Sequence, residues 1–147
     1  MKTLSTIFYG VAIFSTLILT SCKKEGCTDS NAKNFDDEAK KDCDCCTYEG
    51  DVVIWHDETV ATALVSSGVT ALTYYVDGII VGSSASSTFW TGAPTCGQNS
   101  SVTITKDLGI AKNKSYSYSV KDQNGNELWT GVLNFTANTC FQLQLVF

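Results

Sequence analysis

The sequence predicts an all-β fold, a small antiparallel β-sandwich with one short helix, for residues 51–147. From residue 51 onward, short segments alternate apolar and polar side chains with the period of two that strands show. Turn signals such as Asp77-Gly78 and Asn124-Gly125 separate these segments. No long helical pattern lies between them, and an α/β fold would need several. An antiparallel sandwich therefore fits the pattern best.

About seven strands are expected in this body, as in an Ig-like sandwich. In chain order, we expect them at residues 53–55, 72–76, 79–81, 102–105, 115–120, 129–135 and 141–145. The segment 115–120 is the clearest, because three serines alternate with two tyrosines and a valine. One short helix is expected between the first two strands, since Asp57 can cap its N-terminus and Gly68 can end it.

Composition excludes several classes of function. The 147-residue chain has a formal net charge of −5 and no Arg, so it lacks the guanidinium forks that bind phosphates and guanines. Nucleic acid is therefore not an expected partner. The one histidine, His56, is expected at a strand end, where Asp57 could hold it, with no catalytic role. No nucleophile elbow or phosphate-binding loop is present, and we expect no catalytic residues and no enzymatic activity.

Residues 1–21 have the features of a lipoprotein signal peptide. Lys2 precedes an apolar run over residues 7–19, which is shorter than the roughly 20 residues that a spanning helix needs. The run ends in Leu19-Thr20-Ser21-Cys22, which resembles a bacterial lipobox. The resemblance implies that Cys22 becomes the first residue and carries lipid, so the membrane is an expected partner.

Residues 22–50 are expected to form a lipidated, cysteine-rich acidic neck. This segment has few large apolar residues, so disulfides or contacts with the body must hold it. With Cys22 used for lipid, six cysteines remain, an even number that suggests disulfides in an exported chain. Four of them, Cys27, Cys43, Cys45 and Cys46, lie in the neck. From these residues alone their pairing stays open, although adjacent Cys45 and Cys46 rarely bond each other.

The neck contains the most recognisable stretch of the chain. It runs Gly26-Cys27-Thr28-Asp29-Ser30-Asn31-Ala32-Lys33-Asn34-Phe35, followed by Ala39, Asp42 and Cys46-Thr47-Tyr48. This pattern resembles a short cysteine module that is frequent in exported proteins of Bacteroidota. Cys27 and Cys46 fall at its two cysteine positions, which favours Cys27–Cys46 with Cys43–Cys45, or the same set exchanged by one partner. Cys43 and Cys45 depart from the module, which usually reads D-G-S-C here.

Motifs in the body extend the resemblance. They are Val53-x-Trp55, Leu72-x-Tyr74-Tyr75-Val76-Asp77-Gly78-x-x-Val81-Gly82, Cys96-Gly97 and Trp129-x-Gly131. Together with the neck, they make the chain similar to uncharacterised exported lipoproteins of Bacteroidota. The resemblance implies a small sandwich on a lipid anchor and implies no particular activity. Cys96 and Cys140 are the only cysteines of the body and are expected to pair, which in the chain-entropy model is worth about 4 kcal/mol.

Two kinds of metal site are candidates in the neck. Hard oxygen ligands suited to Ca²⁺ are supplied by Asp29, Asn31, Asn34, Asp36 and Asp42, although their spacing does not match an EF-hand. The four neck cysteines have the ligand count of a zinc site, but an oxidising compartment argues against free thiolates. We expect a neck held by disulfides and no cofactor, with structural Ca²⁺ as the alternative.

Two functions compete. The first is a non-enzymatic, lipid-anchored lipoprotein that serves as an accessory or interaction subunit of an outer-membrane assembly, with another envelope protein as partner. The absence of Asp directly after Cys22 favours the outer membrane, and we prefer its cell-surface face to the periplasmic one. The tract Ser83–Thr88 is either a loop or an edge strand that accepts a partner's strand. The alternative is a surface module that binds glycan or peptide through exposed aromatics, first Trp90 and Tyr75.

Overall fold

The structure is a computed structural model that describes residues 23–147. The expected signal peptide and the expected lipid-attachment residue Cys22 lie outside the described residues. Within residues 23–147, no helix has the length and apolar character needed to cross a membrane.

Two sheets form the sandwich, and the predicted all-β fold class is confirmed. The first sheet has the order β6-β3-β9, with β3 at Tyr48–Trp55, β6 at Val102–Gly109 and β9 at Cys140–Gln144. The second has the order β5-β4-β7-β8, with β4 at Ala71–Val76, β5 at Ile79–Ala85, β7 at Asn113–Asp122 and β8 at Glu127–Thr136. Each of the seven expected strands is present. The neck adds a short parallel pair, β1 at Glu25–Gly26 and β2 at Lys41–Asp42.

The helix also forms where the sequence predicts it. Helix α1 spans Glu58–Ser66, and the Asp57 side chain accepts a hydrogen bond from the Val60 N–H at 3.0 Å. Gly68 follows the helix with φ +78°, a conformation that glycine adopts without the steric cost of a side chain.

One pair of strands departs from the expected antiparallel arrangement, because β9 pairs with β3 in parallel. The connection from β8 reaches the first sheet at the start of β3. There the Asn138 N–H donates to Glu49 O at 2.8 Å, and the Asp51 N–H donates to Thr139 O at 2.9 Å. Because β9 enters beside the beginning of β3, it has to run in the same direction.

The main core lies between the two sheets. Almost fully buried side chains of β3, β4, β7 and β8 meet there, among them Val52, Ile54, Leu72, Tyr74, Val76, Val120, Leu133 and Phe135. The rings of Tyr116 and Phe135 meet edge to face, with centroids 5.4 Å apart.

The loop over residues 86–101, which we call the cover loop, lies over the other face of the three-stranded sheet. Val53 alternates with Val52 and Ile54, so it points away from the second sheet, yet it is fully buried. The cover loop reaches this face through the disulfide Cys96–Cys140 and a hydrogen bond from Gln142 Nε2 to Pro94 O of 2.9 Å. Strand β3 is therefore buried on both faces.

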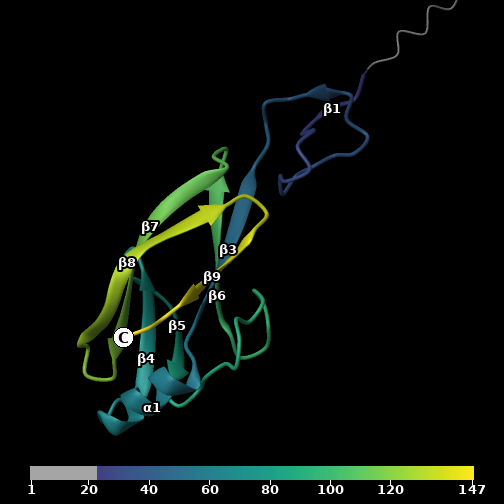
Figure 1. Ribbon diagram of the computed structural model, residues 1–147. Coiled ribbons are helices and arrows are strands. Elements are labelled where there is room, and N and C mark those ends of the chain that lie inside the picture. The colour runs from purple at the N-terminus through teal and green to yellow at the C-terminus, as the bar shows by residue number, and fades with distance from the viewer. Residues whose placement is uncertain (1–22) are drawn as a thin grey trace, which may run out of the picture.

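The expected boundary between neck and body, after residue 50, falls inside β3. This strand already begins at Tyr48 and pairs with β6 from there, with a register irregularity after Tyr48. Cys27 and Ala32 of the neck belong to the same buried cluster as the sandwich core. Figure 1 shows the neck at the end of the sandwich opposite α1. Neck and body thus share a strand and a core.

Candidate functional site

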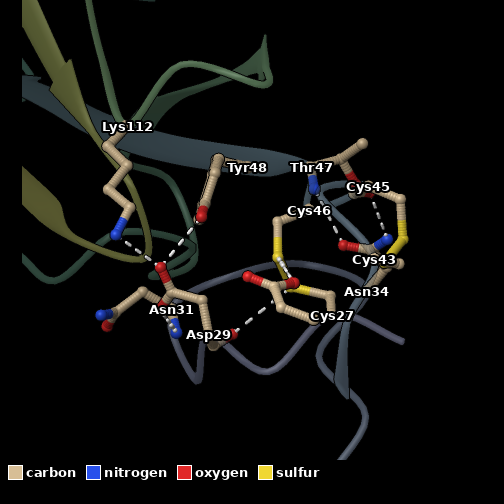
Figure 2. Close-up of a disulfide and its surroundings, with 11 residues drawn as sticks. Cys27, Asp29, Asn31, Asn34, Cys43, Cys45, Cys46, Thr47, Tyr48 and Lys112 are labelled. Carbon is tan, nitrogen blue, oxygen red and sulfur yellow. Dashed lines mark hydrogen bonds and ion pairs between the residues drawn. A yellow bond between two sulfur atoms is a disulfide. The ribbon is translucent and has the colours of Figure 1, made fainter. Parts of the chain in front are cut away.

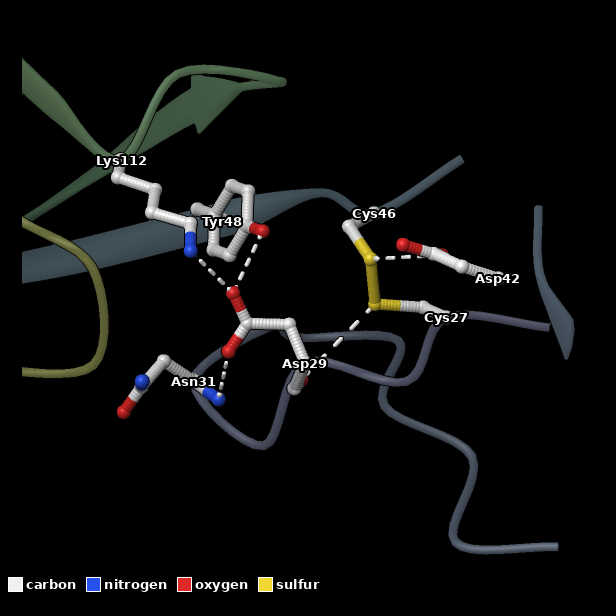
Figure 3. Close-up of polar contacts among 7 residues, drawn as sticks. All are labelled: Cys27, Asp29, Asn31, Asp42, Cys46, Tyr48 and Lys112. Atoms are coloured by element: carbon white, nitrogen blue, oxygen red, sulfur yellow. Dashed lines mark hydrogen bonds and ion pairs between the residues drawn. A yellow bond between two sulfur atoms is a disulfide. The ribbon is translucent and has the colours of Figure 1, made fainter. Parts of the chain in front are cut away.

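The junction between neck and sandwich is built around the Asp29 carboxylate (Figure 3). Tyr48 at the start of β3 donates its hydroxyl to Asp29 Oδ2 at 2.9 Å, and Lys112, just before β7, places Nζ 2.6 Å from the same oxygen. The Asn31 N–H donates to Asp29 Oδ1 at 2.9 Å. The disulfide Cys27–Cys46 fixes this geometry, because it ties the chain two residues before Asp29 to the chain two residues before Tyr48.

The electrostatics of this junction favour the ionised carboxylate. The Lys112 ammonium, the Asn31 N–H and the Tyr48 hydroxyl, in that order of effect, hold the pKa of Asp29 well below its usual range. The same contact raises the pKa of Lys112. Desolvation, followed by the hydrogen bond to Asp29, raises the pKa of Tyr48. Near neutral pH, Asp29 is therefore anionic and Lys112 cationic, and the two form an ion pair between neck and body.

We expect acid to loosen the neck from the sandwich. Because the pKa of Asp29 in the folded state is lowered, its contribution to stability is complete above the ordinary carboxyl value of 3.8 and is lost as the pH falls below it. The protection of the neck amides from hydrogen exchange, measured relative to the unfolded chain, should fall as the pH drops below about 4.

A variant pair separates this effect from general acid loosening. In Asp29→Asn, the neck amides should be less protected from exchange near neutral pH than in the parent, and their protection should fall less in acid. Asp37→Asn removes an exposed carboxylate of the same neck and should leave both unchanged. Equal acid sensitivity of Asp29→Asn and the parent would rule out Asp29 as the group responsible.

The predicted calcium ligands do not converge on one point. They are Asp29, Asn31, Asn34, Asp36 and Asp42, and two of them, Asp29 and Asp36, are paired with lysines instead. The Asn34 side-chain amide is hydrogen-bonded to the backbone of Cys45 and Thr47. Among residues 23–147, no group of three His, Cys, Asp or Glu side chains is arranged to hold a metal ion. Calcium binding stays a prediction, and a melting temperature that chelator leaves unchanged would reject it.

The neck cysteines pair in the first of the two expected arrangements, and the two body cysteines pair as expected. The structure contains the disulfides Cys27–Cys46, Cys43–Cys45 and Cys96–Cys140. The two neck disulfides are drawn in Figure 2. Cys27 is buried against the core, whereas Cys45 is exposed. No zinc site is therefore available among these four neck cysteines, because none of them is a free thiolate.

The two aromatic residues chosen as ligand-binding candidates lie apart. Tyr75 is half-buried and alternates with buried Tyr74, so it faces away from the core, and Lys121 Nζ lies 5.1 Å from its ring centre. Trp90, in the cover loop, is also half-buried and lines a small cavity near Tyr74 and the end of β3. Its neighbour Phe89 lines a separate groove of about 260 Å³ beside α1. Trp90 and Tyr75 thus form no common aromatic face.

His56 has a structural environment. It is buried, and its Nε2 lies 3.2 Å from Ser86 O at the start of the cover loop. The sequence suggested that Asp57 could hold the ring, but the Asp57 carboxylate caps α1 instead. Burial lowers the pKa of His56, so the ring is neutral near pH 7 and donates from Nε2 to the carbonyl.

Strand β8 is an edge strand of unusual length and composition. It has ten residues and lies at the end of the four-stranded sheet, with no strand beyond it in the part of the chain that the structure describes. From residue 128 to residue 136 it contains no charged residue and no proline. Natural edge strands are usually protected by lysine, proline, bulges or short length. Val132, at its centre, is 63% exposed.

The free hydrogen-bonding groups of β8 can be identified from the ladder. Backbone N–H and C=O groups of one residue point to the same side of an antiparallel pair, and the side alternates along the strand. In β7, Ser117 O accepts a hydrogen bond from the Asp77 N–H, so the backbone groups of Ser117 point toward β4. Those of the next residue, Tyr118, therefore point toward β8, where Tyr118 pairs with Gly131. The alternate residues of β8, which are Thr130, Val132 and Asn134, therefore direct their N–H and C=O groups outward.

The other edges of the sandwich are less open. Residues 83–85 of the tract expected as a loop or an edge strand belong to the edge strand β5, which has a bulge opposite Tyr74 and Tyr75. The register irregularity of β8 lies near its start, opposite Val120 and Lys121. Its Gly82 also lies against Val102 of β6. Strand β9 has only five residues, and β6 carries Lys106 and Asp107. Beyond β5, the tract contains a buried serine, Ser86, whose hydroxyl donates to Val69 O at 2.6 Å.

Sequence reasoning missed Lys112 and the edge of β8. An exposed lysine between two strands gives no signal of its partner, whereas the long uncharged run at 128–136 was visible and is typical of an unprotected strand. Comparison of the chain with protein-family models, curated proteins and solved structures finds no significant match.

Proposed function

We propose that this chain is a non-enzymatic, lipid-anchored lipoprotein of the cell envelope whose sandwich binds another envelope protein along the edge of β8. The signal-peptide features of residues 1–21 and the lipobox at Cys22 support the anchor. The open, uncharged edge of β8 supports the binding role and is the observation that carries it. The outer membrane, at its cell-surface face, is the proposed location.

The partner contributes an extended strand that runs antiparallel to β8. Backbone groups of Thr130, Val132 and Asn134 supply the hydrogen bonds, as in other cases of strand addition. Their side chains, together with the serines of β7, form a flat uncharged face beside the new strand. A partner strand with small or apolar side chains at alternate positions fits this face, because Thr130, Val132 and Asn134, which lie next to it, carry no charge.

A different protein fits this edge better than a second copy. The neck joins the body at the end where β8 finishes, next to Glu49 and Asn138. A second copy paired antiparallel through β8 would have its neck at the opposite end. Two lipid anchors at opposite ends do not easily enter one membrane when only residues 23 and 24 separate each proposed lipid site, Cys22, from β1.

The test is recovery of the partner after crosslinking in intact cells and purification of the lipidated chain in mild detergent. Val132→Lys places a charge on the proposed edge and should lower recovery at least about tenfold, which corresponds to about 1.4 kcal/mol. Ile80→Lys is the matched control, because Ile80 is 62% exposed on the opposite edge of the same sheet. It should leave recovery unchanged.

Two outcomes contradict the proposal. Equal recovery with Val132→Lys and Ile80→Lys would show that the β8 edge does not bind the partner. The absence of any stoichiometric partner of the parent chain would remove the accessory role altogether. Glycan arrays with Trp90→Ala would then test the carbohydrate-binding alternative.

A further inference from the structure

We propose that the Cys43–Cys45 disulfide is a thiol–disulfide exchange site, and that Cys45 Sγ is the atom that a partner's thiolate attacks. The partner is a dithiol protein or small dithiol of the envelope, which becomes oxidised as Cys43 and Cys45 become reduced. The other two disulfides keep the fold. This inference is independent of the binding role proposed for β8.

The three disulfides differ greatly in how much of the fold depends on them. Their cysteines are separated by 2, 19 and 44 residues for Cys43–Cys45, Cys27–Cys46 and Cys96–Cys140 respectively. In the chain-entropy model, a disulfide stabilises the folded state more as the loop it closes becomes longer. A disulfide is in turn harder to reduce when its reduction destabilises the fold. The bridge Cys43–Cys45 has the least protection of this kind.

Contacts other than the bridge also hold the surroundings of Cys45 (Figure 2). The Asn34 side chain donates from Nδ2 to Cys45 O at 2.9 Å, and Asn34 Oδ1 accepts from the Thr47 N–H at 2.8 Å. Cys46, between these two points, is held by Cys27 in the second disulfide. The backbone on the C-terminal side of the exchange site is therefore fixed by contacts that do not involve Cys43.

The backbone between the two cysteines favours opening. Asp44 has φ 52°, in the left-handed region, which costs free energy for a residue with a side chain. Once the bridge is open, Asp44 can return to an ordinary conformation. The closed bridge thus carries a local cost at the one residue between its two cysteines.

Exposure determines which sulfur is attacked. Cys45 is exposed, whereas Cys43 is half-buried and packs against the core cluster. A thiolate forms a bond to Cys45 Sγ, the Cys43–Cys45 bond breaks, and its electron pair leaves on Cys43 Sγ, which takes a proton from water. The partner's second thiolate then attacks the partner's first sulfur, which is bonded to Cys45 in the mixed disulfide. A disulfide forms within the partner, and Cys45 leaves as a thiolate. Two electrons pass from the partner dithiol to the bridge.

The first test is a titration of the full-length lipidated protein with dithiothreitol, with acid quench, alkylation and peptide mapping. We expect Cys43 and Cys45 to become alkylated at a dithiothreitol concentration at least about tenfold lower than the one that opens Cys96–Cys140. The melting temperature should be unchanged at the point where only this pair is open. Opening of all three disulfides in one cooperative step, or of Cys96–Cys140 first, would overturn the proposal.

A second test locates the attacked atom and does not depend on a folded variant. Brief exposure of the parent protein to glutathione, a monothiol, should trap a mixed disulfide that peptide mapping finds on Cys45. An adduct mainly on Cys43 would overturn the assignment of the attacked sulfur. The double variant Cys43→Ser with Cys45→Ser is the control and should form no adduct in the neck while it melts as the parent does.

Discussion

Replacing Cys96 and Cys140 together by serine is expected to lower the free energy of unfolding by about 4 kcal/mol. The bridge joins residues 44 positions apart, and it is the covalent tie between the cover loop and β9. Without it, the unfolded chain gains conformational freedom, and the cover loop is held to the sheet mainly by single hydrogen bonds such as that from Gln142 to Pro94. Total stabilities of small domains are about 5–15 kcal/mol, so the loss is severe.

Denaturant unfolding under non-reducing conditions measures this effect. The variant should unfold at a clearly lower denaturant midpoint than the parent, with Val53 exposed to solvent when the cover loop lifts. Cys43→Ser with Cys45→Ser is the control, because this bridge spans only two positions and should shift the midpoint little. Equal shifts for the two double variants would contradict a role for the cover loop in stability.

The second large effect is expected at Gly50, where β3 passes the end of β8. A Cβ atom on Gly50 would lie 2.5 Å from Thr136 O and 3.2 Å from Thr136 C, both backbone atoms. Backbone cannot rotate away as a side chain can, and on either side of Gly50 the chain is hydrogen-bonded to residues 138 and 139. Gly50→Ala is therefore expected to cost about 3 kcal/mol, at the upper end for overpacking.

The matched control for Gly50 is Gly92→Ala in the cover loop. No heavy atom lies within 4 Å of a Cβ built there, and its φ is not in the left-handed region. Thermal and denaturant unfolding of the two variants should give a large destabilisation for Gly50→Ala and a change within about 0.5 kcal/mol for Gly92→Ala. A Gly50→Ala variant as stable as the parent would show that β3 and β8 can separate at this crossing without cost.

Features that depend on the local sequence pattern were predicted, whereas features that depend on contacts between distant segments of the chain were missed. Alternation placed the seven strands, and the Asp57 cap with Gly68 placed α1. Alternation does not encode which strands pair, so the parallel β9 and the exposed edge of β8 were not anticipated. The expected boundary after residue 50 falls inside β3, because Tyr48 completes the neck motif and also begins this strand. Its hydroxyl binds Asp29, a contact that no periodicity reveals.

The candidate site was predicted in part. The disulfide pairs followed from counting and from the resemblance of the neck, and they are present in the structure. Burial could not be inferred in the same way, because Trp90 and Tyr75 have aromatic side chains that suit a core or a surface equally. The oxygen-rich neck suggested a metal, whereas Asp29 has Lys112 as its counter-charge, a residue more than 80 positions away in the chain.

The place of β3 has a mechanical consequence. Tension applied between the neck and the body runs along β3, which is hydrogen-bonded to β6 on one side and to β9 on the other. Because ladder hydrogen bonds lie across the strand direction, such a pull acts on both ladders in shear and loads their bonds together. The opposite geometry, peeling a strand from one end, would break the bonds singly. The neck is thus attached to the sandwich through the strand that two ladders hold against such a pull.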